Sequence, residues 1–402
     1  MVYGITLPCK KIEVMRNLKR FTVFVLGVIL AACAALIATD NAHVFSGLRK
    51  TYLMGKKTPD IDDMNYFDVR EVATSNTQQT LIYSGYNQRK LSAVDQAWSD
   101  SMGTTAFLVF WRDSLVYEEY AEGDAATKSN SFSMAKSITS ALIGRAIDEG
   151  FISSVDDRVG LYLSTYNQGA DTALTIRRLL EMTSGIPFGE SYSSPFGYVA
   201  KSYYGSDLSE ATLRFHVGEA PGTRWAYEGG NTVLLGMILK QATGMSPSEF
   251  CSTRFWSPMG AEHDAFWNLD DENGMEKTFS GFYATARDFA RFGLLYLNDG
   301  IWRGDTLVSP DWVRQSLTPH LVPDEAHVSC EWYGWHWWLG NFKGHSFFVS
   351  RGLRGQYVLG LPDSELMLVR LGHAQDKARL DHMPVDLYRY INIALNLVPT
   401  KK

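Results

Sequence analysis

Residues 133–150 decide the fold of this chain and read Ser-Met-Ala-Lys-Ser-Ile-Thr-Ser-Ala-Leu-Ile-Gly-Arg-Ala-Ile-Asp-Glu-Gly. Apolar residues recur here at helical spacing, and they are Ile138, Leu142, Ala146 and Ile147. Gly150 is a typical stop signal, so the pattern predicts a helix over residues 133–149. Ser133 and Lys136 open this helix three residues apart, so their side chains share one face and can meet.

The pairing of Ser133 with Lys136 is typical of nucleophilic catalysis. A free serine hydroxyl is a poor nucleophile and needs a base. A lysine amine is such a base only when its surroundings lower its pKa from about 10.4. Ser-x-x-Lys occurs once in this chain, directly after the polar residues 128–131, which suit the start of a helix. We therefore predict Ser133 as a nucleophile and Lys136 as its base.

Composition limits the classes of protein to which the chain can belong. Its 402 residues are 45% hydrophobic and 20% charged, enough for one large domain or two fused ones. A formal net charge of −6 without a long basic run argues against nucleic acid as a partner. No metal or other cofactor is expected, because the histidines and cysteines lack the spacing of a metal motif. The Gly-x-Ser-x-Gly elbow of Ser-His-Asp hydrolases is also absent.

The N-terminal part differs from the rest in composition. Residues 21–38 carry no charge, and the basic segment 1–20 precedes them. This length suffices for a membrane-spanning helix, and the basic flank predicts a cytoplasmic N-terminus. We predict an uncleaved anchor over residues 21–39 in a bacterial inner membrane, with the catalytic part in the periplasm or otherwise outside the cytoplasm. A cleaved signal and a lipoprotein anchored at Cys33, in Leu30-Ala31-Ala32-Cys33, remain alternatives.

Strand-like runs lie near both ends of the remaining chain. Residues 104–110 and 114–120 predict a hairpin, and three more strands are expected over 346–350, 356–361 and 366–371. Further helices are expected over residues 175–183, 232–243, 285–297 and 384–397. The predicted fold class is α/β, more narrowly α+β. An antiparallel sheet from both chain ends is flanked by helices, with a helical subdomain between its two halves.

Residues 40–95 show no sustained periodicity and are predicted as an extension or linker. The globular domain would then span residues 96–400.

Several motifs, in this order, resemble one known family. They are Ser133-Met134-Ala135-Lys136 and residues 179–186 (LLEMTSGI), 221–227 (PGTRWAY), 284–293 (ATARDFARFG), 333–338 (YGWHWW) and 351–356 (RGLRGQ). Together they resemble the serine hydrolases related to class C β-lactamases, and most closely the 6-aminohexanoate-dimer hydrolase branch. The resemblance covers about residues 100–398. It implies a β-lactamase-like fold, no cofactor and a small amide or ester as substrate.

The resemblance also implies roles for individual residues. Ser133 would be acylated, Lys136 would be its base, and Tyr227 would pass a proton to the leaving group. Residues 350–352 would form a third motif on an edge strand, where Gly352 lets the substrate lie close. The N–H groups of Ser133 and Leu353 would form the oxyanion hole. Further candidates for substrate binding are Arg351, Trp335, Trp338 and Glu228.

Two positions depart from the family pattern. Gly229 stands where an Asn is expected two residues after the tyrosine, and Ser350 stands where a Lys is expected. These departures weaken the expectation of β-lactam hydrolysis. Arg351 or Arg354 would supply positive charge instead, or pair with Glu228, or face water.

The predicted function is that of a membrane-tethered serine hydrolase cleaving a small amide or ester. Two alternatives remain, a non-catalytic penicillin-binding-like envelope protein and a β-lactamase or D,D-peptidase. The natural substrate, the oligomeric state and the pairing of Cys251 with Cys330 stay open at this level.

Overall fold

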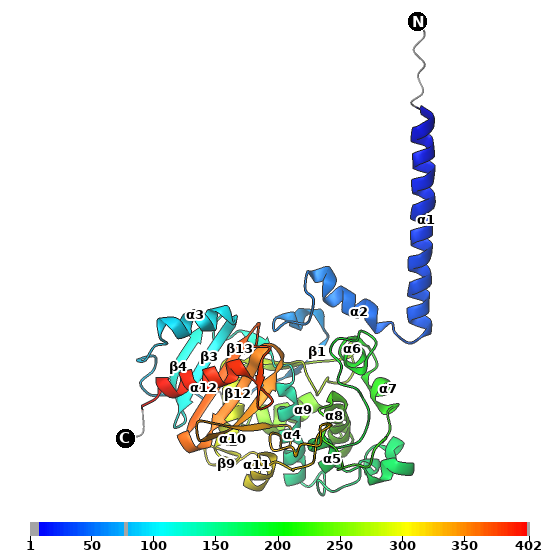
Figure 1. Cartoon of the computed structure of the whole chain (residues 1–402). Coiled ribbons are helices and arrows are strands. Elements are labelled where there is room, and N and C mark those ends of the chain that lie inside the picture. Colours follow the sequence, from blue (N-terminus) through cyan, green and yellow to red (C-terminus); the bar gives the residue numbers. More distant parts are fainter. Residues whose placement is uncertain (1–7, 76–78, 400–402) are drawn as a thin grey trace.

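The computed structural model describes residues 8–75 and 79–399, with side chains from Glu13 onward. Within these residues a seven-stranded sheet has the order β10-β11-β12-β13-β3-β4-β2 (Figure 1). Its strands are β2 (Ile82–Tyr83), β3 (Thr104–Trp111), β4 (Ser114–Tyr120), β10 (Trp338–Phe342), β11 (His345–Gly352), β12 (Gln356–Leu361) and β13 (Leu366–Gly372). All neighbours pair antiparallel except β2, which runs parallel to β4. Both ends of the globular part therefore meet in one sheet, as the sequence predicts.

Successive side chains of strand β3 point to opposite faces of this sheet, and helices cover both faces. Phe107 and Val109 pack with α12 (Val385–Leu397) on one face, where α3 (Ala93–Ser101) also lies. Leu108 and Phe110 point to the opposite face and pack with α10 (Ala286–Leu297). The result is a layered molecule with the sheet between two sets of helices.

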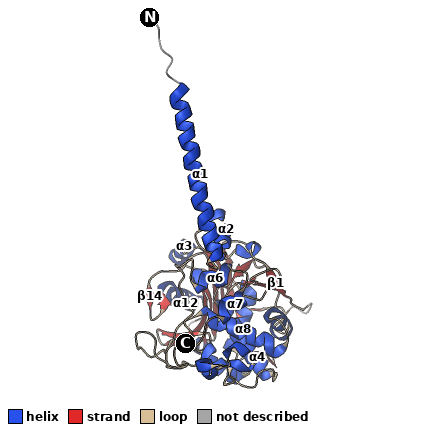
Figure 2. Ribbon diagram, turned by 90° about the vertical axis from the view of Figure 1, so that its right-hand side faces the viewer, coloured by secondary structure: helices blue, strands red, loops and turns tan. Residues whose placement is uncertain are grey.

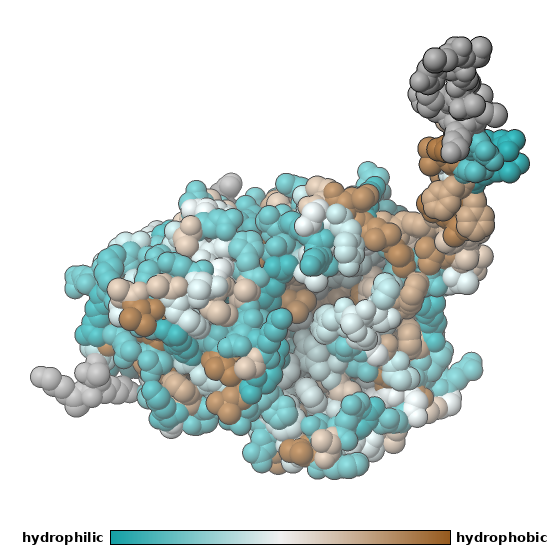
Figure 3. Space-filling view, turned by 45° about the horizontal axis from the view of Figure 1, so that its top comes forward, coloured by the Kyte–Doolittle hydropathy of each residue, from teal (hydrophilic) through white to brown (hydrophobic). Residues whose placement is uncertain are grey.

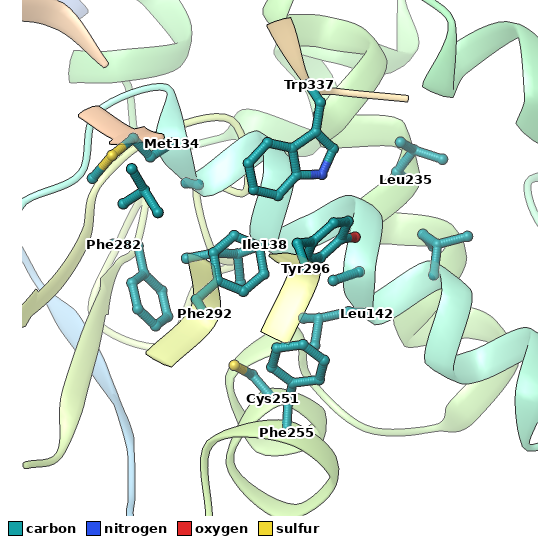
Figure 4. Close-up of a cluster of buried hydrophobic side chains, with 14 of the residues drawn as sticks. Met134, Ile138, Leu142, Leu235, Cys251, Phe255, Phe282, Phe292, Tyr296 and Trp337 are labelled. Carbon is teal, nitrogen blue, oxygen red and sulfur yellow. The ribbon is translucent and has the colours of Figure 1, made fainter. Parts of the chain in front are cut away.

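Helix α4 (Met134–Asp148) is the centre of the helical region. It is buried almost all round, which is typical of a helix enclosed by others. Figure 4 shows Ile138 and Leu142 of this helix among aromatic side chains such as Phe292 and Tyr296. Helices α8 (Gly229–Thr243) and α9 (Pro247–Cys251) pack directly against it. The region also contains α5 (Ile176–Leu180), α6 (Tyr198–Tyr204), α7 (Leu208–Leu213) and α11 (Pro310–Ser316).

A second, four-stranded sheet leads directly into α4. Among the described residues its order is β1-β6-β7-β5, with strands β1 (Val69–Val72), β5 (Lys128–Asn130), β6 (Ala265–Asn268) and β7 (Phe282–Thr285). Strand β5 ends three residues before Ser133, so this sheet fixes where the helix begins. Two short ribbons complete the strands, β8 (Ile301–Trp302) with β9 (Asp305–Thr306) and β14 (Arg379–Leu380) with β15 (Met383–Pro384).

Helix α1 (Pro8–Ala38) stands away from the body as a single rod (Figures 1 and 2). Its portion Glu13–Ala38 is long and apolar enough to cross a membrane, and a signal sequence would meet the same criterion. The following α2 (His43–Lys50) lies on the body. Residues 40–95, which carry no periodic signal, are tied into the fold because β1 pairs with β6 and β2 with β4.

Local details differ from the sequence-based expectations. The helix predicted over residues 175–183 is limited to Ile176–Leu180, because Met182 has a φ of 58° and a helix cannot continue through it. Cys251 and Cys330 are both buried with free thiols, so no disulfide joins them.

Candidate active site

A constrained turn places Ser133 at the start of α4. Phe132, directly before it, has a φ of 45°, a conformation that costs about 1–3 kcal/mol for a residue with a side chain. The Asn130 carboxamide oxygen accepts the Phe132 N–H at 2.8 Å and holds this conformation. The Ser131 hydroxyl accepts the Phe282 N–H at 3.2 Å, which ties the turn to β7. The serine is thus presented half-buried at a helix N-terminus.

Lys136 lies one helical turn behind Ser133. Its ammonium nitrogen is 3.1 Å from the Ser133 hydroxyl oxygen and 3.0 Å from the Phe279 carbonyl oxygen. The side chain is almost fully buried, with 2% of its surface exposed. Its amine is therefore held by two short contacts, one of which is the hydroxyl that a base would deprotonate.

The ring of Tyr227 lies close to the lysine. The Lys136 nitrogen is 4.9 Å from the centre of the Tyr227 ring. Behind the tyrosine, Trp338 and Tyr333 hold its ring, with centroids 5.5 and 6.0 Å away. The structure thus brings together the three side chains for which the sequence predicts chemistry.

The end of strand β11 passes directly beside the serine turn. Ser350 is fully buried, and its hydroxyl lies 3.4 Å from the carbonyl oxygen of Met134. A Cβ atom at Gly352 would lie 2.1 Å from the Ser131 carbonyl oxygen. The glycine is therefore required by the chain's own backbone, whereas the sequence suggested close approach of a substrate. Leu353 follows and lines the same cavity as Ser133.

The cavity at Ser133 has a volume of about 410 Å³, within the range of small-molecule sites. Ser133, Lys136 and Phe279 line it. Residues of α2 and α6 line it too, and both elements lie outside the motifs that carry the family resemblance. Glu190, in the loop before α6, also reaches the cavity.

Two carboxyl groups hold the residues around Tyr227. Glu228 accepts the Gly189 N–H at 3.2 Å, and Glu190 accepts the Gly229 N–H at 2.7 Å. Burial raises the pKa of the Glu228 carboxyl to about 7, against hydrogen bonds from the backbone of Gly189 and Phe188. The neighbouring Glu190 carboxylate adds to that rise. This reciprocal pair closes the loop 189–190 against the start of α8.

Position 229 is closely packed where the family pattern would place an Asn side chain. A Cβ atom at Gly229 would lie 3.3 Å from the Phe279 ring and 3.4 Å from the Glu190 carboxylate. An Asn there would extend further than Cβ and displace one of them.

Three predicted site residues have other surroundings than expected. The prediction that Trp335 binds substrate is wrong, because its side chain lies in the core, with its ring centroid 4.8 Å from that of Trp312. Its carbonyl accepts the hydroxyl of Ser140, two helical turns from Ser133. Arg351 stacks on Trp338 at 3.7 Å and donates to the His382 carbonyl instead of pairing with Glu228. Trp338 is buried behind Tyr227 and supports that ring.

Arg354 does not pair with Glu228 either. Its guanidinium donates to the carbonyls of Pro59 and His373 and to the Thr58 hydroxyl, all at 2.8 Å. It therefore joins the extension to the end of β11.

His336 is buried close enough to Lys136 to feel its charge. Burial, followed by the positive charge of Lys136, lowers its pKa to about 3, so it is neutral. Its Nε2 lies 3.0 Å from the Thr232 hydroxyl, and its carbonyl accepts the Ser137 hydroxyl. The described residues include no group of His, Cys, Asp and Glu side chains placed to hold a metal ion.

Glu190, Phe279 and the α2–α6 wall were missed by sequence reasoning. Each reaches the cavity through long-range packing, and their local sequences carry no spacing signal. Only the apolar positions Val44 and Leu48, four residues apart, could have indicated an apolar face on α2.

Comparison with known proteins agrees with this geometry. Residues 92–388 match the Beta-lactamase family. The chain is 27% identical over 294 residues to the 6-aminohexanoate-dimer hydrolase of Paenarthrobacter ureafaciens, covering 68% of this chain and 73% of that protein.

Solved structures share the fold. A Bacillus anthracis protein provisionally assigned as a 6-aminohexanoate-dimer hydrolase has a TM-score of 0.70 at 23% identity, covering 83% of this chain and 92% of that one. A family VIII carboxylesterase has a TM-score of 0.61 at 16% identity, covering 80% and 99%. The chain therefore belongs to the β-lactamase family of serine hydrolases.

Proposed function

We propose that this protein is a membrane-tethered serine hydrolase that cleaves an amide or ester through an acyl-enzyme on Ser133. The observation that supports this most is the 3.1 Å contact between the Lys136 nitrogen and the Ser133 hydroxyl, both of which line a cavity of ligand size. Nucleophile and base are thus within the distance that proton transfer requires.

The reaction follows from these positions. The Ser133 oxygen attacks the acyl carbon while its proton passes to the Lys136 amine. The N–H groups of Ser133 and Leu353 stabilise the charge that develops on the acyl oxygen. Tyr227 relays the proton to the departing alcohol or amine. Water then attacks the acyl-enzyme, which releases the carboxylic acid and restores the serine hydroxyl.

The tether is the second part of the proposal. The portion Glu13–Ala38 of α1 has the length and composition of a membrane span, and none of it is covered by the rest of the chain. A single apolar rod of this kind is stable in a bilayer, because its backbone groups are bonded within the helix.

A β-lactamase, a D,D-peptidase or a penicillin-binding protein without turnover has less support. Gly229 has no side chain and is closely packed against Phe279 and Glu190, and the Ser350 hydroxyl lies 3.4 Å from the Met134 carbonyl oxygen. The two polar groups that the family pattern expects at these positions are therefore missing.

An activity probe tests the proposal. A fluorophosphonate should label the full-length protein in detergent, and the label should be lost in Ser133→Ala. Ser101→Ala, which removes an exposed serine of α3, serves as the matched control and should be labelled like the wild type. Absence of labelling in a folded wild-type protein would favour the non-catalytic alternative. A panel of p-nitrophenyl esters and anilides then separates esterase from amidase activity.

A further inference from the structure

The cavity at Ser133 has an apolar roof that belongs to the segment directly after α1. Val44, Gly47, Leu48 and Thr51 line it. These positions are spaced three and four residues apart, so one face of α2 is turned toward the cavity. Val199, Ala200, Tyr203 and Tyr204 of α6 form the adjoining wall.

This roof is fastened at both ends. On the α6 side, Asp40 pairs with Lys201 and Arg214, and His43 Nε2 lies 2.9 Å from the Pro195 carbonyl. On the other side, the Arg354 bonds to Pro59 and Thr58 attach the extension to the residues after β11. The extension therefore crosses the site as a strap, and it lies outside the part that matches the family.

The strap also fixes the distance between the cavity and the membrane. The charge-free residues 21–38 extend about 27 Å as a helix, close to the thickness of about 30 Å of a bilayer's hydrocarbon core. Ala38 then lies at the edge of that core. Five Cα steps separate it from His43, a span of at most about 18 Å. With α1 across a bilayer, the roof of the cavity thus begins within about 18 Å of the hydrocarbon core.

The surface around this roof has the composition of a membrane contact. Tyr52, Leu53 and Met54, directly after α2, are exposed, and Leu53 exposes 78% of its surface. Arg49 and Lys57 flank them with exposed side chains, whereas Lys56 pairs with Asp62 and Asp63 and Lys50 lies over the Phe67 ring. Figure 3 shows apolar side chains running from the base of α1 across the adjoining surface, beside a hollow.

We propose that the substrate is the acyl ester or amide of a membrane amphiphile, whose alkyl chain enters the cavity between α2 and α6 from the bilayer surface. This inference rests on the proposed function and names its substrate class. The acyl carbon would reach Ser133 at the polar end, while the chain lies along Val44, Leu48 and Val199. Hydrolysis consumes one water and releases a long-chain carboxylic acid together with the alcohol or amine.

Chain length provides the first arm of the test. For full-length protein in detergent, kcat/KM for p-nitrophenyl esters should rise from acetate to dodecanoate by about two- to fourfold for each CH₂ that enters the cavity. Leu48→Asp places a charge in the roof, and Val44→Phe fills the space instead. Each should lower the ratio of dodecanoate to acetate at least tenfold, because chain binding is lost. Leu161→Asp, at an apolar residue that exposes 68% of its surface and does not line the cavity, should keep the ratio.

Presentation of the substrate provides the second arm. Full-length protein in phosphatidylcholine–phosphatidylglycerol vesicles should hydrolyse a dodecanoyl ester of 4-methylumbelliferone faster when protein and ester share vesicles than when they are in separate ones. Equal rates would overturn the membrane as the source of the chain.

Turnover without preference for long chains, or an unchanged ratio in both roof variants, would overturn the inference while leaving the serine hydrolase intact. No turnover of any ester together with no fluorophosphonate label on Ser133 would overturn the proposed function itself and this inference with it.

Discussion

The carbonyl oxygen of Ser131 lies 2.1 Å from the point that a Cβ atom at Gly352 would occupy. The end of strand β11 and the turn before the serine are thus in direct backbone contact. We expect Gly352→Ala to separate them, and displacement by about 1 Å costs up to about 10²-fold in rate. Steady-state kinetics with a p-nitrophenyl ester should therefore show a loss in kcat that exceeds any loss in thermal stability.

Gly218→Ala is the control for this substitution. Its Cβ would meet Pro187 at 3.5 Å, an ordinary contact, so activity should remain near that of the wild type. Full activity in Gly352→Ala would contradict the expectation that catalysis depends on the close contact between the end of β11 and the serine turn.

Lys136 and Tyr227 should act as one unit with the serine. Lys136→Ala and Tyr227→Phe should each lower kcat by about 10²-fold or more, since each interrupts the route of the proton. The double variant should lose little more than the worse single one, as expected for groups in one relay. Strictly additive losses would contradict a shared proton route.

Histidine variants separate this mechanism from a histidine-based one. His345 lies at the beginning of β11, where its Nδ1 is 2.9 Å from the Ser364 hydroxyl, and His373 lies between Asp60 and Glu122. Substitution of either by Ala should cost far less in kcat than Lys136→Ala. An inactive His345→Ala beside an active Lys136→Ala would show that another base is used.

Glu228 should make stability depend on pH. Its pKa of about 7 lies above the usual 4.5, so the folded protein binds this proton more tightly than the unfolded chain. Its contribution is complete below pH 4.5 and is lost as pH rises through 7, by about 3 kcal/mol at most.

Denaturant titrations between pH 5 and 8 check this expectation. Glu228→Gln should remove that part of the decline, whereas Glu71→Gln, at an exposed position of β1, should retain it. Parallel pH profiles for wild type and Glu228→Gln would show that the carboxyl is ionised throughout.

The tether predicts how the protein fractionates. The full-length chain should sediment with membranes at unchanged mass, and a chain beginning at Asp40 should be released. Intact-mass analysis of the membrane fraction distinguishes the alternatives. A mature N-terminus at Cys33 carrying lipid would establish a lipoprotein, and cleavage without lipid would contradict an anchor of either kind.

Much of the fold follows from local patterns in the sequence. The hairpin of β3 and β4, the three strands β11 to β13 and helix α4 can each be recognised from the spacing of their apolar residues. The contact of Ser133 with Lys136 follows from helical geometry alone. Tyr227 could be placed only through its family resemblance.

The remaining features depend on packing between distant segments. Trp335 was assigned to the site through the family resemblance of residues 333–338, but the chain turns at His336, which has a φ of 64°, and Trp335 faces the core. The roof over Ser133 joins residues 43–59 to α6 and to the end of β11. No local period reveals such a contact, because it depends on where these segments meet in space.

Trapping of the acyl-enzyme tests the central claim most directly. Full-length protein should be quenched with acid during turnover of an ester and digested, and the peptide that contains Ser133 should be analysed by mass spectrometry. We predict an added acyl mass on Ser133, none in Ser133→Ala, and a loss in kcat of at least about 10³-fold in that variant. An acyl group on another residue, or undiminished turnover in Ser133→Ala, would contradict the account.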